Sequence, residues 1–347
     1  MKINLKQLQE KEMHAFIERL GQSPFRARQV INWIYKKSAA SFDEMTDLPV
    51  TLREELKKTA YISNVNLLKK QVSKDGTQKF LFELEDGKTI ESVLIPDKNR
   101  HTLCISSQVG CAMECKFCMT GRLGLKRNLM AYEMVDQVIA VSRIIAGGTL
   151  KTTRITNIVF MGMGEPLNNF DEVIDALRRL TGIMDFSGQK ITISTAGIVP
   201  KISALAQKGP GVNLAVSLNA STDEIRSKIM PVNKRYPIKE LITACKRFPL
   251  APRKRITFEY VLLKGINDSK EDAVRLIKLL RGIKSKVNLI PYNSAPSIMP
   301  LQDKKPVEGQ VLFFQKILTD AGITAIIRKS KGQDILAACG QLQGSNI

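Results

Sequence analysis

Apolar residues recur at helical spacing through the N-terminal part of the chain. Met13, Phe16, Ile17 and Leu20 follow this spacing, and a second helical pattern follows after a Ser-Pro pair. Because a helix with one apolar stripe must bury that stripe against a neighbour, we expect these helices to pack together. The pattern predicts an N-terminal helical domain over residues 1–60.

The hydrophobic period changes over residues 61–96. Apolar and polar positions alternate through 79–84, between Asp-Gly pairs at 75–76 and 86–87. Alternation bounded by such turns is typical of hairpins. We therefore expect a small antiparallel β segment here.

From 97 to 330, short apolar runs alternate with amphipathic helical stretches, which is typical of βα units on a parallel sheet. Strands are expected at 103–107, 157–161, 191–194, 212–218, 256–263 and 287–291. Helices are expected at 131–145, at 170–181 after the cap candidate Asn169, and at 270–280 after Ser269. Six units predict an α/β protein with a partial (βα)6 barrel of the TIM type, followed by a last strand-like stretch at 323–327 and a polar C-terminal tail at 331–347.

The charge balance is unusual for an otherwise ordinary globular composition. Lys and Arg number 53 against 33 Asp and Glu, which leaves a net charge of +20. Such a surplus attracts polyanions, so we favour the interpretation that the positive charge binds nucleic acid over the alternative that it serves only solubility. The N-terminus lacks the apolar core of a signal peptide, and no run of 18 apolar residues occurs. We expect a cytoplasmic protein without a membrane partner.

Three of the six cysteines, Cys111, Cys115 and Cys118, fall within eight residues after the first barrel strand. In the cytosol they are better interpreted as metal ligands than as disulfide partners. Cys104 or His101 could complete a tetrahedral zinc site. Three thiolates on an iron-sulfur cluster would instead leave one iron open to an external ligand, and we favour this interpretation.

Polar residues follow several barrel strands at their carboxyl ends, the edge where barrel enzymes bind ligands. After the second strand, Gly164 permits close backbone approach and Glu165 can accept a hydrogen bond from an ammonium group. The other candidates at strand ends are Ser194, Ser217, Leu218, Asn219 and Asn293. Any one alone is more typical of a cap or turn, but together they predict a ligand site on the rim that carries the cysteine loop.

The cysteine spacing resembles that of the radical S-adenosylmethionine (SAM) superfamily, in which SAM chelates the open iron of a [4Fe-4S] cluster. Segments 104–111, 162–166, 217–219 and 337–342 together resemble one family, the radical SAM adenine C2-methyltransferases that act on 23S rRNA and tRNA. The similarity covers essentially the whole chain. It implies a radical SAM barrel with the cluster on Cys111, Cys115 and Cys118, and SAM on the rim residues.

The same resemblance implies a mechanism that uses two SAM molecules per turnover. Cys339 receives a methyl group and becomes S-methylcysteine, a radical then removes a hydrogen from it, and the carbon adds to C2 of adenine. Glu91 matches the family's proton acceptor, and Cys104 the thiol that attacks Cys339 and frees the product through a transient disulfide. The local sequence alone would make Glu91 a solvated charge, Cys104 and Cys339 buried thiols, and Cys245 a core residue.

The resemblance leaves several alternatives open. Asn219 departs from the histidine more common in the family, so its hydrogen bond to SAM would differ. A methyltransferase specific for C8 of the same adenine shares most motifs, and a non-catalytic zinc or iron-sulfur RNA-binding protein is the alternative of another class.

The remaining expectations concern RNA and protein partners. Arg26, Arg28, Lys36 and Lys37 are candidates for gripping RNA phosphates. The alternative is that their helical region only caps the barrel. We expect a monomer with a reducing donor such as flavodoxin or ferredoxin.

Overall fold

The computed structural model describes residues 2–147, 154–294, 301 and 304–344. Its N-terminal part contains helices α1 (Glu10–Arg19), α2 (Pro24–Tyr35) and α3 (Val50–Thr59), joined by the short parallel pair β1 (Ile3–Asn4) and β2 (Ala60–Tyr61). The helices predicted from the apolar spacing are present. Pro24 occupies the first turn of α2, where a backbone N–H would have no acceptor within the helix, so the missing N–H of proline costs no hydrogen bond.

A ten-stranded sheet forms the centre of the remaining part of the molecule, with the strand order β14-β13-β12-β11-β10-β9-β6-β5-β4-β3. Its antiparallel strands are β3 (Asn66–Val72), β4 (Gln78–Glu83), β5 (Thr89–Asp97) and β6 (Arg100–Cys104). Its parallel strands continue from β6 through β9 (Asn157–Phe160), β10 (Ile191–Thr195), β11 (Asn213–Ser217), β12 (Ile256–Leu262), β13 (Ser285–Pro291) and β14 (Ala325–Ile327). Because β3 and β14 lie at opposite edges, the described strands form an open, partial barrel. The antiparallel segment predicted at 61–96 continues this sheet.

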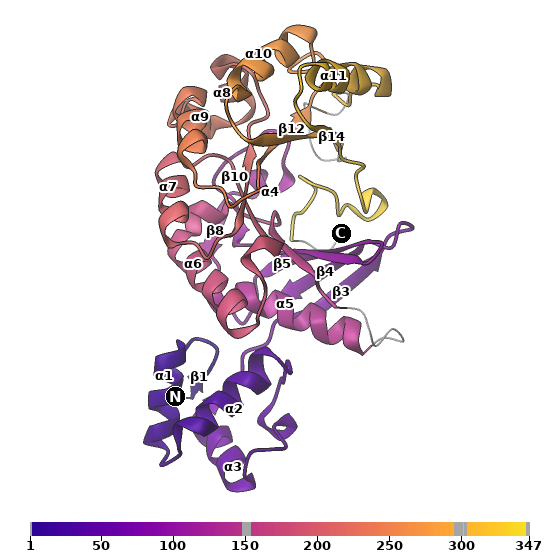
Figure 1. The fold of residues 1–347 in the computed structure, drawn as a ribbon. Coiled ribbons are helices and arrows are strands. Elements are labelled where there is room, and N and C mark those ends of the chain that lie inside the picture. Colours follow the sequence, from indigo (N-terminus) through magenta and orange to yellow (C-terminus); the bar gives the residue numbers. More distant parts are fainter. Residues whose placement is uncertain (1, 148–153, 295–300, 302–303, 345–347) are drawn as a thin grey trace.

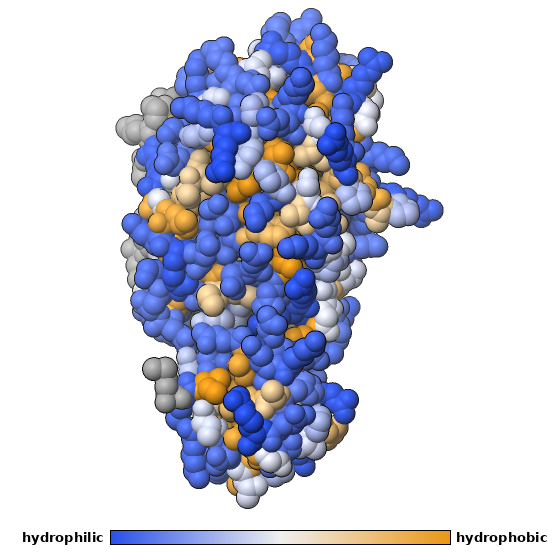
Figure 2. All heavy atoms as spheres, turned by 90° about the vertical axis from the view of Figure 1, so that its left-hand side faces the viewer, coloured by the Kyte–Doolittle hydropathy of each residue, from blue (hydrophilic) through white to orange (hydrophobic). Residues whose placement is uncertain are grey.

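Helices cover the outer, convex face of the sheet (Figure 1). They are α5 (Ala131–Ala146), α6 (Phe170–Arg178), α7 (Val199–Lys208), α8 (Asp223–Ile229), α9 (Ile238–Arg247), α10 (Lys270–Leu280) and α11 (Glu308–Asp320). Figure 2 shows this helical side of the molecule as mainly hydrophilic, with apolar groups scattered between charged ones. No helix in the part of the chain that the structure describes is both long enough and apolar enough to cross a bilayer.

The six predicted barrel strands and three predicted helices are present, with shifted ends in places. The first strand ends at Cys104 rather than at residue 107. Helix α6 ends at Arg178 and continues as one π-helical turn, Arg179–Ile183. Ser269 caps α10 through a capping box with Asp272. Asn169 occupies the N-cap position of α6, as predicted, but its side chain does not cap the helix and instead donates to the carbonyls of residues 107 and 129.

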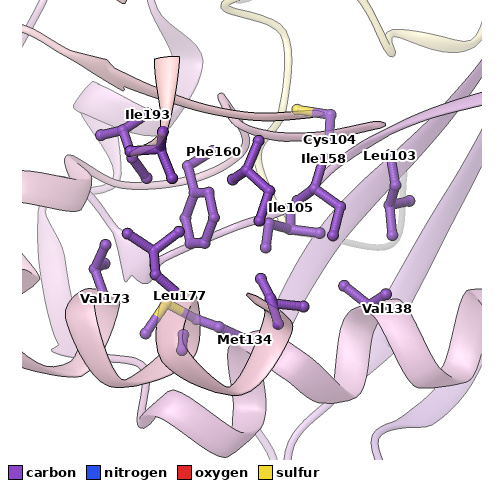
Figure 3. Close-up of a cluster of buried hydrophobic side chains, with 14 of the residues drawn as sticks. Leu103, Cys104, Ile105, Met134, Val138, Ile158, Phe160, Val173, Leu177 and Ile193 are labelled. Carbon is purple, nitrogen blue, oxygen red and sulfur yellow. The ribbon is translucent and has the colours of Figure 1, made fainter. Parts of the chain in front are cut away.

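One part of the main core lies between the sheet and the helices α5 and α6 (Figure 3). Side chains of successive strand residues point to opposite faces, so every second residue reaches this core. The buried residues on the strands, or directly after them, include Leu103, Ile105, Ile158, Phe160 and Ile193, and the helices contribute Met134, Val138, Val173 and Leu177. Cys104, between two of these residues, therefore belongs to the opposite, inner face.

Buried polar contacts join the N-terminal part to the barrel. The Lys6 ammonium pairs with the Asp136 carboxylate at 2.5 Å, and the two side chains are 1% and 3% exposed. Arg179 donates to the backbone carbonyl of Lys6 and, at 2.9 Å, to the hydroxyl of Tyr35. Buried charges are tolerated only when paired, so these contacts hold the two parts in one arrangement.

Candidate functional site

The loop with the three clustered cysteines begins after β7 (Gln108–Gly110), which pairs with β8 (Leu125–Asn128), and ends at α4 (Met119–Arg122). Gly110 has φ +76°, and a Cβ there would lie 1.9 Å from the carbonyl oxygen of Gly124. Only glycine fits this turn. Backbone hydrogen bonds anchor the loop, from Cys111 to Gly124 at 3.1 Å and from Lys116 to Ile229 at 2.9 Å.

Cys111, Cys115 and Cys118 line one cavity of about 170 Å³ on the inner face of the sheet. Burial raises the pKa of Cys111 to about 12 and also raises the pKa of Cys115 and of Cys118. Thiolates here therefore need positive charge nearby, which the iron atoms of a cluster would provide.

The zinc alternative requires side chains that converge on one ion. Among the described residues, no three His, Cys, Asp or Glu side chains do so. Cys104 and His101, the candidate fourth ligands, are outside the set of residues that line the cavity. The three cysteines of this loop would therefore hold an iron-sulfur cluster with three ligands better than a zinc ion that needs four.

Gly164 and Glu165 lie on the rim of the cavity, after β9. Gly164 has φ +99°, and a Cβ would lie 2.6 Å from the Cβ of Gln108, so the backbone can pass only as glycine. The buried Glu165 carboxylate accepts from the N–H of Leu167 at 3.0 Å and from the N–H of Ala196 at 2.6 Å. Burial raises the pKa of Glu165 to about 6, although these hydrogen bonds act in the opposite direction and lower it. The carboxylate keeps lone pairs for a further donor such as an ammonium group.

Four other predicted rim residues, Ser194, Ser217, Asn219 and Asn293, line the same cavity, whereas Leu218 does not. The backbone groups of Leu218 are already engaged, since its N–H donates to the backbone carbonyl of Glu259 at 3.1 Å and its carbonyl accepts from the Arg226 guanidinium at 2.9 Å. Asn219 adopts φ +56°, and its side-chain oxygen accepts from the N–H of Val261 at 2.8 Å. The rim predicted from strand ends is therefore assembled.

The C-terminal tail returns across the open side of the barrel and brings Cys339 into the same cavity (Figure 1). The Asn293 amide donates to the Cys339 carbonyl at 3.2 Å, and the Met119 N–H donates to the Gly340 carbonyl at 2.7 Å. Cys339 remains accessible from the cavity. The protein atoms around its sulfur shield it from water, and this desolvation raises the pKa of the thiol to about 11. The sulfur predicted to carry the methyl group thus shares a cavity with the cluster cysteines.

Cys104 lies on β6, and in Figure 3 its sulfur points away from the apolar core. Burial raises the pKa of the Cys104 thiol, and the charge of a Cys339 thiolate would raise it further. The sulfur of Cys104 lies on the inner face of the sheet, the face that also carries the cavity lined by Cys339. All six cysteines are free in this structure. Cys245 is a buried core residue, 1% exposed, as its helical pattern predicts.

Glu91 lies on the same face of the sheet as Cys104. Val93 pairs with Cys104 across β5 and β6, and Glu91 is two residues before Val93 on the same side. Glu91 is 1% exposed, so the expectation of a solvated charge from its local sequence is wrong. It pairs with the Lys79 ammonium at 3.0 Å, and it accepts from two backbone N–H groups of the tail, at 2.7 and 3.1 Å.

Three buried charged residues near the site escaped the sequence analysis. Lys79, besides pairing with Glu91, donates to the backbone carbonyl of Leu336 in the tail at 3.3 Å. Glu259 lines the cavity from β12 and accepts from the Asn288 amide at 2.9 Å. A carboxylate inside an apolar strand was a usable signal for Glu259. Arg226 is fully buried, but a lone arginine in a polar helix gives no such signal.

The chain matches two family models. Residues 3–62 match the ribosomal RNA large subunit methyltransferase N-terminal domain, and residues 105–277 match the radical SAM superfamily. The first match covers the helical region expected at 1–60, and the second begins just before the cysteine loop.

Curated relatives and one solved structure agree with these matches over nearly the whole chain. The dual-specificity RNA methyltransferase RlmN of Geotalea uraniireducens is 50% identical over 99% of this chain and 97% of its own length, and that of Pelobacter propionicus is 49% identical over 99% and 96%. The crystal structure of a radical SAM methyltransferase from Sphaerobacter thermophilus superposes with a TM-score of 0.93, at 43% identity over 99% of this chain and 100% of that one. The chain therefore belongs to the RlmN family of the radical SAM superfamily.

Proposed function

We propose that this protein methylates C2 of an adenine in 23S rRNA and in tRNA, through S-methylcysteine at Cys339 and with two SAM molecules per turnover. The observation that carries the proposal is that Cys339, from the far end of the chain, lines one cavity with Cys111, Cys115 and Cys118. Its relatives are named dual-specificity RNA methyltransferases, and its superfamily uses a [4Fe-4S] cluster and SAM. When bound, these groups supply a radical that removes an unactivated hydrogen.

The rim residues bind and orient SAM in this proposal. Cys111, Cys115 and Cys118 hold the cluster, and Glu165 accepts from the amino group of SAM. Ser194 and Ser217 offer hydroxyl groups to its ribose, carboxylate or adenine. Asn219 and Asn293 each keep one amide N–H for SAM, because the other N–H and the side-chain oxygen already bond within the protein. Leu218 does not line the cavity and its backbone groups are already hydrogen-bonded, so we assign it no direct contact with SAM.

Cys339 acts as the methyl carrier. Its pKa of about 11 keeps it a thiol at neutral pH, and a sulfonium cation bound in the same cavity would favour the thiolate. The thiolate sulfur then forms a bond to the methyl carbon as the carbon-sulfur bond of SAM breaks. A thiolate is needed because C2 of adenine is not nucleophilic enough to take the methyl group directly.

Glu91 and Cys104 release the product. After the carbon on Cys339 has bonded to C2, Glu91 takes the proton from C2, and the adduct gives up one electron, which returns to the oxidised cluster. The Cys104 thiolate then attacks the Cys339 sulfur, so that a sulfur-sulfur bond forms while the carbon-sulfur bond breaks, and the released carbon takes up a proton to become the methyl group. Their placement on the inner face, with the tail resting on Glu91, supports these roles.

The N-terminal part offers a surface for RNA. Phe25 is 53% exposed, and the guanidinium groups of Arg26 and Arg28 each lie 5.9 Å from its ring centroid. An aromatic ring between two cations suits an unpaired base and its phosphates. Lys36 instead pairs with Asp185 at 2.5 Å, and Lys37 lies over the ring of Trp33 at 3.6 Å. We therefore assign the RNA contact to Arg26 and Arg28. We further propose that the protein is a cytoplasmic monomer, and that a flavodoxin or ferredoxin supplies its electrons.

Two cysteine variants test the mechanism. Cys104→Ala should accumulate a covalent RNA-protein species, detected as a shifted band on a denaturing gel, because nothing then attacks the Cys339 sulfur. Cys339→Ala should give neither the adduct nor methylated RNA, while Cys245→Ala, a buried cysteine outside the cavity, serves as the matched control. If Cys339→Ala still methylated RNA, the methyl-carrier role would be wrong. Nucleoside mass spectrometry separates C2 from the C8 alternative.

A further inference from the structure

Arg226, in α8, is the largest fully buried side chain of the described residues. Its guanidinium donates to the carbonyls of Leu218 at 2.9 Å, Ala196 at 2.6 Å and Ser217 at 3.1 Å. A further bond of 3.0 Å joins it to the side-chain oxygen of Asn233. One planar group therefore fixes the carboxyl ends of two neighbouring strands, β10 and β11.

The same helix is joined directly to the cysteine loop. The Ile229 carbonyl, one turn beyond Arg226, accepts from the N–H of Lys116 at 2.9 Å. Cys115 packs in a small apolar cluster with Ala196 and Ile229. Arg226 thus bridges the rim proposed for SAM and the loop proposed for the cluster.

Within the described part of the chain, Arg226 forms no ion pair with a carboxylate. A buried cation held only by neutral oxygens is costly, and burial lowers the pKa of Arg226 to about 10. The cysteine loop lies beside the same elements that Arg226 holds, because Lys116 donates to Ile229 of its helix and Cys115 packs against the cluster that contains Ala196, whose carbonyl accepts from Arg226. A thiolate at Cys115 would therefore be a counter-charge on the neighbouring loop.

We propose that Arg226 is a positioning residue with two roles: it is the fixed counter-charge of the cluster thiolate on Cys115, and it holds the SAM-binding ends of β10 and β11 against the cluster loop. This inference rests on the proposed function for the placement of the cluster and of SAM. It does not depend on the methyl-carrier chemistry of Cys339.

The two roles make separate physical demands. A positive charge beside a ligand thiolate stabilises the more negative, reduced cluster, so it raises the reduction potential. Holding three carbonyls at once needs the flat fork of a guanidinium, which the compact ammonium of lysine cannot supply. Arg226→Lys keeps the charge and loses the fork, whereas Arg226→Met loses both.

The experiment measures two quantities on the reconstituted, full-length protein under anaerobic conditions. The first is the midpoint potential of the cluster, from a redox titration followed by electron paramagnetic resonance. The second is SAM affinity by equilibrium dialysis. We expect Arg226→Met to shift the potential to more negative values and to weaken SAM binding tenfold or more. We expect Arg226→Lys to keep the potential of the unmodified protein but to weaken SAM binding to a similar degree.

Arg179→Met is the matched control, because Arg179 is also buried, 5% exposed, but contacts the N-terminal part instead of the rim. It should change neither quantity. A cluster-loaded Arg226→Met with unchanged potential would overturn the counter-charge role, and unchanged SAM affinity in Arg226→Lys would overturn the fork. If Arg226→Met does not fold, the SAM affinity of Arg226→Lys still tests the fork. A cluster potential in Arg226→Lys that differs from that of the unmodified protein would refute the counter-charge role, because this variant keeps the positive charge. An unmodified protein that bound no cluster would instead refute the proposed function.

Discussion

Replacing Lys6 with methionine should destabilise the junction between the N-terminal part and the barrel. The Lys6 ammonium lies 2.5 Å from the Asp136 carboxylate, and both side chains are almost completely buried. Methionine has a similar length but no charge, so Asp136 would remain buried without its cation. The junction positions the surface that we assign to RNA, so its stability bears on function as well as on folding.

The size of the effect follows from the burial of the pair. Removing one partner of a buried ion pair costs about 3–5 kcal/mol, because the remaining charge is uncompensated. With a urea dependence of about 2 kcal/mol per molar, the unfolding midpoint should fall by roughly 1.5–2.5 M. Removing both charges in the double variant Lys6→Met, Asp136→Leu should restore most of this loss.

The chain contains a single tryptophan, Trp33 in α2, so its fluorescence reports unfolding of the N-terminal part specifically. Lys57→Met is the matched control, because Lys57 forms exposed pairs with Asp43 and Glu54 in the same region. It should leave the midpoint nearly unchanged. A Lys6→Met midpoint equal to that of the unmodified protein would refute the reasoning that this pair secures the junction.

Three further predictions follow from other features of the structure. Burial raises the pKa of Asp136 from 3.8 to about 6, so the stability contributed by its protonated form is complete below about pH 4 and lost as pH rises through 6. The urea midpoint should therefore fall between pH 4 and 7 more steeply than in Asp136→Asn, and equal slopes would contradict this. Gly164→Ala should weaken SAM binding at least tenfold, since a Cβ would lie 2.6 Å from its neighbour, whereas Gly182→Ala, which meets open space, should not. Arg26→Glu with Arg28→Glu should weaken RNA binding and flatten its salt dependence at unchanged iron content, and an unchanged affinity over a salt series would reject this RNA contact.

The strands and helices of the barrel were predictable because their patterns are local. Ser269 caps α10, which begins at Lys270, and the apolar period and the helix both end at Leu280, so both bounds agree with the sequence. The end of α6 was not predictable, because its apolar period continues through the π-helical turn at Arg179–Ile183. The side chain of Arg179 is engaged with the N-terminal part, a tertiary contact that no local pattern reveals.

The candidate site divides in the same way. The cysteine loop and the strand-end residues were predictable from spacing and from the rule that barrels bind ligands at one edge. The place of Cys339 could be expected only from the family resemblance, because its tail contacts residues more than 200 positions away, such as Thr120. Lys79 and Arg226 were missed because their roles depend on burial, and an isolated basic residue in a sequence gives no sign of it.

The central claim, that Cys339 carries the methyl group, is tested most directly by mass spectrometry of the peptide containing Cys339. The reconstituted protein would be incubated anaerobically with SAM bearing a deuterated methyl group, under reducing conditions and without RNA. The proposal predicts a labelled methyl group on Cys339 and none on Cys245. RNA that becomes labelled on C2 by a protein whose Cys339 never carries the label would contradict it.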